Sequence, residues 1–308
     1  MHSNAKRSIP WVLSLALATA AAAAPPASTA PTASEILAAS TAADWRPLDL
    51  DDTVYLELAT GRVVIELAPA FAPLHVRNIK ALVKAGYFNG LAIVRVQDNY
   101  VVQWADPEGT RAVPADIGRV AAEFDVSSAA VADFTRFTGG DIYAPEVGFA
   151  NGFPVARDPK RGRTWLAHCY AMVGVGRDDD TQSSGTELYA VIGHAPRHLD
   201  RNVTLVGRVV AGIEHLSSLP RGSAEMGFYA KGEAPVPVRA MELASDVAPA
   251  ERTNLEIFRT DTPRFAALIE SRRNRPESWF VTKPGHIDLC NVPIPVRALP
   301  AAQTAASH

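Results

Sequence analysis

Short β-rich runs, each ended by turn residues, recur along most of this chain. Two of them, VYLEL and RVVIEL, are separated only by Ala-Thr-Gly, which predicts a β-hairpin over residues 54–67. Branched and aromatic residues favour strands, whereas Gly, Asp, Ser and Pro at the ends of the runs favour turns. Many short strands with few helices favour a β-barrel or a β-sandwich. The other runs are LAIVRV, YVVQWAD, YAMVGVG, ELYAVIG and VTLVGRVV.

Two segments have the pattern of helices. In PLHVRNIKALVKAG, the apolar residues Val76, Ile79 and Val83 fall on one helical face, and the final glycine provides a C-terminal stop. We expect this amphipathic helix to pack on a sheet. A second helix is predicted in PRFAALIESRRNR, with Thr262 as its N-cap and proline at its first position.

Composition places the chain among ordinary globular proteins. Its 308 residues allow one large or two modest domains, and 47% apolar against 20% charged residues is enough to bury a core. Thirty basic and 33 acidic side chains give a net charge of −3, which supplies no broad positive field. We therefore expect no nucleic-acid partner.

The N-terminus has the pattern of a secretory signal peptide. Lys6 and Arg7 precede an apolar run over residues 9–24, and small-residue A-x-A sites crowd the end of that run. We predict cleavage near residue 24, a periplasmic or secreted protein, and membrane contact only through the transient signal. An uncleaved membrane anchor is the alternative. The residues that follow, 25–45, are interpreted as a linker and an N-terminal arm.

The chain contains two cysteines, Cys169 and Cys290. Export to an oxidising compartment would allow them to pair, whereas a cytosolic pair would stay reduced. Two buried free thiols are the other interpretation, and the residues alone do not decide between them.

One predicted hairpin brings three chemically useful side chains together. A reversal centred on Asn99 places Arg95 opposite Gln103, because both lie four residues from the pivot. With the ring of Tyr100 beside them, a guanidinium and a carboxamide would border an apolar wall, as in many small binding sites. An exposed arginine on a strand whose neighbouring ring belongs to the core is the alternative for these residues taken alone.

The order of these features resembles the cyclophilin family of peptidyl-prolyl cis-trans isomerases. GRVVIELAPAFAP, NIKALVKAGYFNGLAIVRV and YVVQWADP look like the opening hairpin, first helix and catalytic hairpin of that family. There a catalytic Arg is followed five residues later by an aromatic and eight residues later by a Gln, which is the register of Arg95, Tyr100 and Gln103. The resemblance continues through AAEFD and GRDDDTQSSGTELYAVIG to Leu219.

The resemblance implies a mainly β fold: a closed antiparallel eight-stranded β-barrel capped by helices. We place this barrel at residues 46–220, with a long insertion at about 107–164. Residues 221–308 lie beyond a minimal member of the family and are interpreted as a C-terminal extension packed on the barrel.

The resemblance also implies a site. Arg95 and Gln103 match the catalytic positions. Four positions depart from the family pattern: Glu187 replaces Gln, His198 replaces Trp or Phe, Val203 replaces a pocket His, and Val94 replaces the His before the catalytic Arg. The residues expected to bind substrate are Tyr100, Val101, Gly176, Arg177, Glu187, Tyr189, His198 and Leu199.

The implied reaction needs no cofactor or metal, because rotation about a peptide bond breaks no covalent bond. The expected function is to accelerate X-Pro rotation in exported proteins, with Arg95 stabilising the twisted imide. The expected partners are proline-containing peptides or unfolded exported proteins, and the oligomeric state is left open. The alternative is a non-catalytic binding or chaperone module that holds proline-containing segments in the same groove.

Other motifs favour structural roles. His194 and His198 have an H-x3-H spacing, but the proline between them argues against a zinc-binding helix. Asp178–Asp180 lacks the spacing of a calcium loop, and the basic cluster at residues 157–163 is typical of a solvated loop. The chain has no G-x-S-x-G motif of a serine hydrolase.

Overall fold

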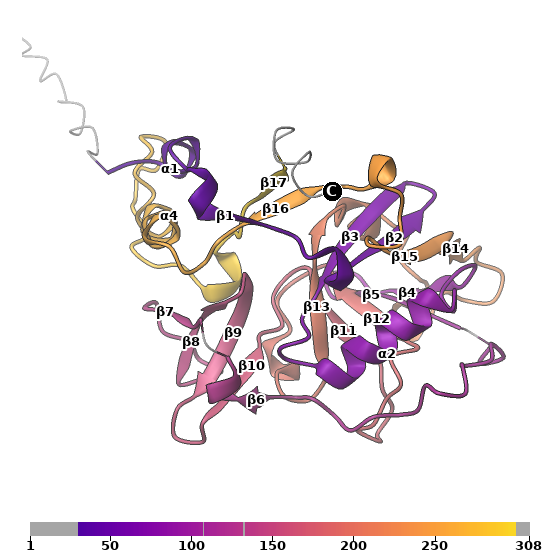
Figure 1. The fold of residues 1–308 in the computed structure, drawn as a ribbon. Coiled ribbons are helices and arrows are strands. Elements are labelled where there is room, and N and C mark those ends of the chain that lie inside the picture. Colours follow the sequence, from indigo (N-terminus) through magenta and orange to yellow (C-terminus); the bar gives the residue numbers. More distant parts are fainter. Residues whose placement is uncertain (1–29, 107, 132, 300–308) are drawn as a thin grey trace, which may run out of the picture.

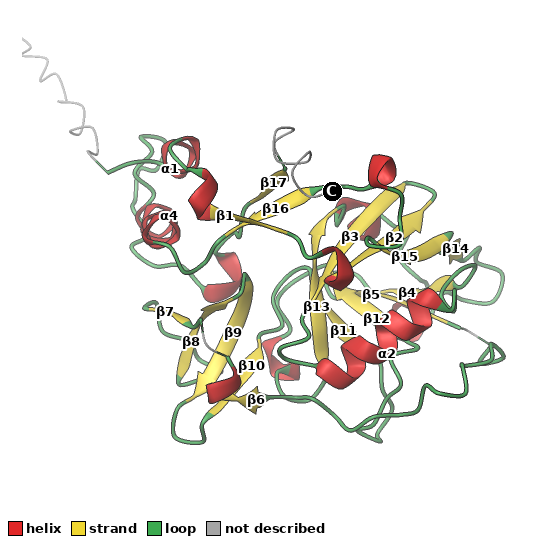
Figure 2. Ribbon diagram, viewed as in Figure 1, coloured by secondary structure: helices red, strands yellow, loops and turns green. Residues whose placement is uncertain are grey.

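The computed structural model describes residues 30–106, 108–131 and 133–299. The predicted signal peptide, residues 1–24, lies outside the described residues, as does the first part of the predicted linker. In Figure 1 the chain forms two neighbouring parts, a large sheet crossed by helix α2 and a smaller sheet beside helices α1 and α4. Strands and loops account for most of the described chain (Figure 2). Within the described part, no helix is long and apolar enough to cross a membrane.

The large sheet contains nine strands, and every pair in it is antiparallel. Its order is β14-β4-β5-β12-β11-β13-β3-β2-β15. Each strand predicted from a β-rich run is present. The strands are β2 (Thr53–Leu58), β3 (Gly61–Leu67), β4 (Ala92–Val96), β5 (Val101–Ala105), β11 (Met172–Val175), β12 (Leu188–Val191), β13 (Leu205–Ala211), β14 (Val236–Pro237) and β15 (Ala240–Leu243).

The prediction of a closed eight-stranded barrel is wrong. The sheet curls, but β14 and β15 are its two edges and do not pair with each other. They follow one another in the chain, so the Val238 N–H bonds to the carbonyl of Leu91 beside β4, and the Arg239 N–H bonds to that of Glu57 in β2. One short segment thus joins the two edges of the sheet. It also lies after residue 220, so the predicted end of the barrel falls inside the sheet.

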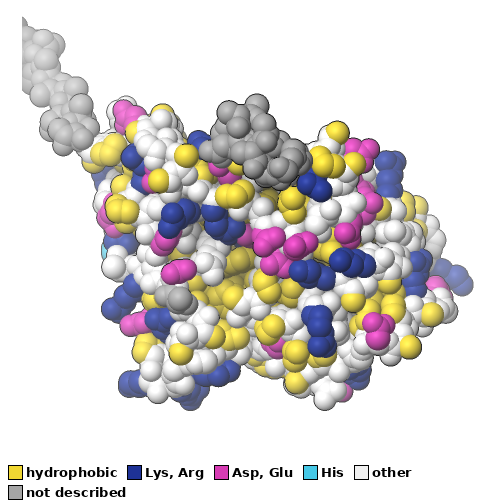
Figure 3. Space-filling model, in the orientation of Figure 1, with side chains coloured by type: hydrophobic (Ala, Val, Ile, Leu, Met, Phe, Trp, Pro, Cys, Tyr) yellow, Lys and Arg dark blue, Asp and Glu magenta, His cyan; other side chains and the backbone are white. Residues whose placement is uncertain are grey.

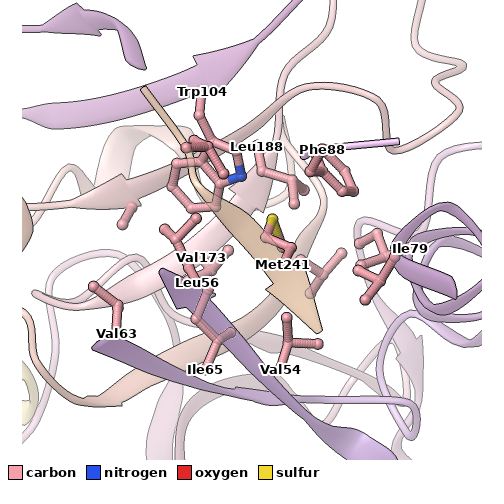
Figure 4. Packing of buried hydrophobic residues seen from close by; sticks show 14 of the residues in the cluster. Val54, Leu56, Val63, Ile65, Ile79, Phe88, Trp104, Val173, Leu188 and Met241 are labelled. Carbon is pink, nitrogen blue, oxygen red and sulfur yellow. The ribbon is translucent and has the colours of Figure 1, made fainter. Parts of the chain in front are cut away.

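Helix α2 (Pro73–Lys84) packs against the large sheet and contributes buried residues to its core. The predicted helical face is confirmed, because Val76, Ile79 and Val83 are all buried. Gly86 follows the helix with φ +67°, a left-handed conformation that glycine adopts without steric cost. Figure 4 shows Ile79 of α2 and residues of strands β2, β3, β5, β11, β12 and β15 converging on this core, with Phe88 at one side.

The predicted insertion forms a sheet of its own. Its strands are antiparallel and take the order β6-β10-β9-β8-β7. The last strand of the insertion leads into the segment before β11. The strands are β6 (Val126–Ser127), β7 (Thr135–Phe137), β8 (Glu146–Ala150), β9 (Phe153–Asp158) and β10 (Arg163–Leu166).

The N-terminal arm and the C-terminal extension pack beside this second sheet. Helix α1 (Ala33–Ala38) lies within the predicted linker and arm, and it contacts helix α4 (Pro263–Asn274). The predicted N-cap of α4 is confirmed, since the Thr262 hydroxyl accepts from the Phe265 N–H. A three-stranded sheet joins the arm to the extension, in the order β1 (Trp45–Pro47), β16 (Leu255–Phe258), β17 (Val296–Ala298). Helix α3 (Glu214–Ser217) follows β13.

The two cysteines form a disulfide, which decides the alternative that the sequence left open. Cys169 and Cys290 have Cα atoms 5.0 Å apart and are separated by 121 residues. The bond ties the segment just before β11 to the C-terminal extension. It therefore fastens the second part of the molecule to the large sheet.

The buried His75 at the start of helix α2 is hydrogen-bonded to Glu123 of the insertion. Glu123 accepts hydrogen bonds from the backbone N–H groups of Leu74 and His75, both at 2.9 Å, and so caps the helix. The His75 ring lies between Glu123 at 2.7 Å and Ser183 at 2.8 Å. This order of groups resembles a hydrolase triad, but the His75 side chain is fully buried, and the backbone of Ser183 is paired with Val120. The arrangement serves as a structural tie.

Candidate active site

The predicted hairpin β4–β5 is confirmed. Arg95 pairs with Gln103 across the two strands, and Asn99 at the turn has φ +52°. The register shifts between Ile93 and Arg95, so the strand bulges just before the arginine. This local geometry brings the guanidinium and the carboxamide to the same side of the sheet, where Nη1 of Arg95 donates to Oε1 of Gln103 at 3.3 Å.

A segment of the predicted C-terminal extension holds the guanidinium of Arg95 from its other side. We call residues 222–229 the strap. Its carbonyl at Met226 accepts from Nε of Arg95 at 2.7 Å, and the ring of Phe228 lies 5.3 Å from the guanidinium carbon. Tyr100 covers the guanidinium at 5.5 Å, and Gln97 accepts from its Nη2. Partial burial lowers the pKa of Arg95, against the opposing effect of Tyr100 and Glu187, but an arginine keeps its charge.

Gln103 links Arg95 to the half-buried carboxyl group of Glu187. Its Nε2 donates to Oε1 of Glu187, while its Oε1 accepts from Arg95. Burial and the nearby Asp178 raise the pKa of Glu187, and Arg95 opposes this shift. Because an ionised carboxylate only accepts hydrogen bonds, Glu187 determines which end of the Gln103 amide faces Arg95.

These side chains border a cavity of about 510 Å³. Every predicted site residue except His198 lines it, and Val203 joins Val101, Tyr189 and Leu199 as an apolar wall. The full set is Arg95, Tyr100, Val101, Gln103, Gly176, Arg177, Asp178, Asp179, Glu187, Tyr189, Leu199 and Val203. The cavity is thus polar at Arg95 and Gln103 and apolar beside them.

Two glycines allow the wall of this cavity to close. A Cβ on Gly174 would lie 2.4 Å from the Tyr189 hydroxyl, and one on Gly176 would lie 2.5 Å from the carboxyl carbon of Glu187. Both distances are far shorter than normal contacts. The side chains of Tyr189 and Glu187 can therefore lie over these two positions only because the positions carry no side chain of their own.

His198, which was predicted to bind substrate, does not line this cavity. It lies on the short 3₁₀-helix η4 (Arg197–Leu199) and borders a second cavity of about 450 Å³ beside Trp165 and Arg201. Leu199, the next residue, lines the first cavity. In a 3₁₀-helix successive side chains point about 120° apart, so neighbours in the chain face different spaces.

The sequence patterns do not predict three neighbours of the site. Asp178 and Asp179 line the cavity, and the strap contacts Arg95. The acidic run Asp178–Asp180, to which the first two belong, has no recognisable motif in the sequence. Met226 lies 131 residues after Arg95, and no local pattern predicts that contact.

In the described part of the chain, no group of three or more His, Cys, Asp or Glu side chains is placed to hold a metal ion. On the face drawn in Figure 3, basic and acidic side chains are interspersed.

Comparison with known proteins agrees with this geometry. The family described as "Cyclophilin type peptidyl-prolyl cis-trans isomerase/CLD" matches residues 53–254. A "Probable peptidyl-prolyl cis-trans isomerase" from Brucella suis biovar 1 (strain 1330) is 29% identical over 180 residues, which are 58% of this chain and 77% of the relative. Cyclophilin AquaCyp293 from Hirschia baltica, a crystal structure, has a TM-score of 0.66 at 27% identity and covers 82% of this chain and 92% of its own. The family match contains the whole Arg95 hairpin and the strap, and the chain belongs to the cyclophilin-type peptidyl-prolyl cis-trans isomerase family.

Proposed function

We propose that this isomerase accelerates X-Pro rotation in exported proteins and that Arg95 is its catalytic donor. The observation that carries the proposal is the position of the guanidinium, which borders the apolar end of the cavity and is held there from two sides. Proline-containing peptides and unfolded exported chains are the proposed partners. The exported location is proposed from the signal-like pattern of residues 1–24.

The reaction is limited by loss of conjugation in the peptide bond. The barrier is about 18–20 kcal/mol, and X-Pro exchange without a catalyst takes tens to hundreds of seconds. When the bond twists, the proline nitrogen gains a lone pair that the planar ground state lacks. A donor aimed at that nitrogen stabilises the twisted state more than the ground state, which is the requirement for catalysis.

Arg95 has donors available for this task. A guanidinium carries five N–H groups. The contacts to Met226, Gln97 and Gln103 use one each. The remaining N–H groups on the two terminal nitrogens are available to a substrate, while the held side chain pays little entropy when substrate binds.

The other residues have distinct proposed roles. Gln103 is hydrogen-bonded at both ends of its amide, to Arg95 and to Glu187, so it orients the guanidinium. Tyr189, Leu199 and Val101 form the slot that holds the proline ring while the preceding carbonyl rotates. No step of this mechanism transfers an electron or a covalently bound group, so the proposal includes no cofactor.

Exchange NMR on a short X-Pro peptide tests the proposal. We expect Arg95→Ala to reduce the catalysed exchange rate by at least about tenfold, since charged hydrogen bonds are worth about 1.5–3 kcal/mol. Arg161→Ala is the matched control, because the Arg161 side chain is 68% exposed in the insertion. Near-normal exchange by a folded Arg95→Ala protein would refute the assignment. Peptide binding by the wild type without exchange would instead favour the non-catalytic binding module.

A further inference from the structure

A row of buried polar side chains connects the insertion to the walls of the active-site cavity. We call Asp141, Arg197, Asp200, His168 and Tyr189 the polar row. Asp141 belongs to the insertion, Arg197 and Asp200 lie on and next to η4, and Tyr189 lies on β12. No side chain from Asp141 to His168 is more than 8% exposed, and Tyr189 is 6% exposed.

Every link in the row is a hydrogen bond of ordinary length. Arg197 donates from Nη1 to Oδ2 of Asp141 and from Nε to Oδ2 of Asp200, both at 2.7 Å. Oδ1 of Asp200 lies 3.0 Å from Nδ1 of His168. Nε2 of His168 then lies 2.9 Å from the Tyr189 hydroxyl oxygen. The row therefore has no gap between the insertion and the cavity wall.

The chemistry of the groups gives each bond a direction. Burial lowers the pKa of His168, and Arg197 and His198 reinforce this, against the opposing effect of Asp200, so the ring is neutral at pH 7. The carboxylate of Asp200 can only accept, so Nδ1 of His168 carries the proton. Nε2 is then an acceptor, and the Tyr189 hydroxyl must donate to it. The ring of Tyr189 is thereby oriented by its hydroxyl.

The row reaches two walls of the slot from different elements. Tyr189 is its last member, and Leu199 lies between Arg197 and Asp200 in the chain. We propose that the insertion sets the width of the proline slot through the polar row, whose other members act as positioning residues for Tyr189 and Leu199. This inference rests on the proposed function of the cavity. It predicts that a change in the insertion alters peptide affinity without touching Arg95.

Asp141→Asn tests the inference with a small change. Oδ1 of Asp141 accepts from the backbone N–H groups of Tyr143 and Ala144 at 2.8 and 2.9 Å and from Nη2 of Arg197 at 3.2 Å, and an asparagine retains that oxygen. Oδ2, which accepts from Nη1 of Arg197, is replaced by an NH₂ group. Two donors then face each other at that position and the hydrogen bond is lost. Asp116→Asn, an exposed position in the same insertion, is the matched control.

We expect Asp141→Asn to weaken X-Pro peptide binding, measured by NMR titration, by at least about fivefold, because a charge-assisted bond is lost. The exchange rate at saturating enzyme–peptide complex should stay within about twofold of wild type, since the donor on β4 is unchanged. A purely structural role would lower the melting temperature and leave the affinity of the folded protein unaltered. Wild-type affinity in folded Asp141→Asn protein would overturn the inference.

Tyr189→Phe provides a second test that leaves the insertion intact. It removes only the last link of the row, and we expect weaker peptide binding in the same direction. Nitrogen-15 NMR of His168 in the wild type should show Nδ1 protonated and Nε2 unprotonated; the reverse tautomer would contradict the row. If Asp141→Asn does not fold, unchanged affinity in Tyr189→Phe decides against the inference. If the wild-type protein binds peptide but does not catalyse exchange, the proposed function is wrong. The peptide affinities of the wild type and the variants would still test the role of the polar row.

Discussion

Gly227 in the strap offers a direct way to loosen Arg95 without changing any side chain that contacts it. A Cβ at this position would lie 2.5 Å from Cα of Gln97 and 2.8 Å from the carbonyl oxygen of Val96. Both are backbone atoms at the C-terminal end of β4, so they cannot rotate away. Carbon atoms normally approach to about 3.5 Å, so Gly227→Ala must move the strap outward by about 1 Å.

That displacement is enough to break the contact to the arginine. The Met226 carbonyl lies 2.7 Å from Nε of Arg95, and a shift of about 1 Å takes it beyond hydrogen-bond range. A hydrogen bond to a charged group is worth about 1.5–3 kcal/mol, and the lower value converts to about a tenfold loss in kcat/KM. The strap bonds from Gly222 to Val96 and from Tyr229 to Val94 should weaken as well.

A nearby glycine separates this effect from backbone strain. Gly232 has φ +97° and Gly227 has φ +80°, so alanine is strained at both positions. A Cβ on Gly232 meets nothing within 4 Å. We therefore expect Gly232→Ala to lower the melting temperature without changing kcat/KM. Gly227→Ala should lower both the melting temperature and kcat/KM.

Exchange NMR at several peptide concentrations, with a thermal melt of each variant, measures these quantities. Equal activity in the two folded variants would show that the strap does not position Arg95. A tenfold loss in Gly232→Ala would show instead that any strain in this region is transmitted to the site.

Two further predictions concern stability. Removing the disulfide with the double change Cys169→Ala and Cys290→Ala should lower the free energy of unfolding by about 4–5 kcal/mol in a urea titration, as the chain-entropy treatment gives for a loop of this length; an unchanged midpoint would contradict this. Burial lowers the pKa of His168 below its unfolded value of about 6.5. Below that pH the imidazole therefore binds a proton in the unfolded state but stays neutral in the folded state. The stabilisation is therefore complete above pH 6.5 and is lost as the pH falls below it, by up to about 1.4 kcal/mol per pH unit. Melting curves from pH 7.5 to 5.5 should be shallower in pH for His168→Gln, and an identical dependence would rule out His168 as the titrating group.

The local parts of this protein are readable from its sequence. The pairing of Arg95 with Gln103 follows from a turn at Asn99 and from the fixed period of a strand. The buried face of α2 and the N-cap of α4 follow from helical spacing and from a hydroxyl next to a proline. In each case the interacting groups lie within a few residues, so backbone geometry alone brings them together.

The positions of the remaining site residues depend on the tertiary structure. His198 and Leu199 are adjacent in sequence, yet they face different cavities because η4 turns between them. The segment at 236–243 contains the two edge strands, and nothing in its own residues shows that it would join β4 to β2. The same holds for Met226 at Arg95 and for Asp141 at Arg197. Such contacts cross more than 50 residues of chain, and their geometry is set by how whole sheets pack, which no short sequence pattern encodes.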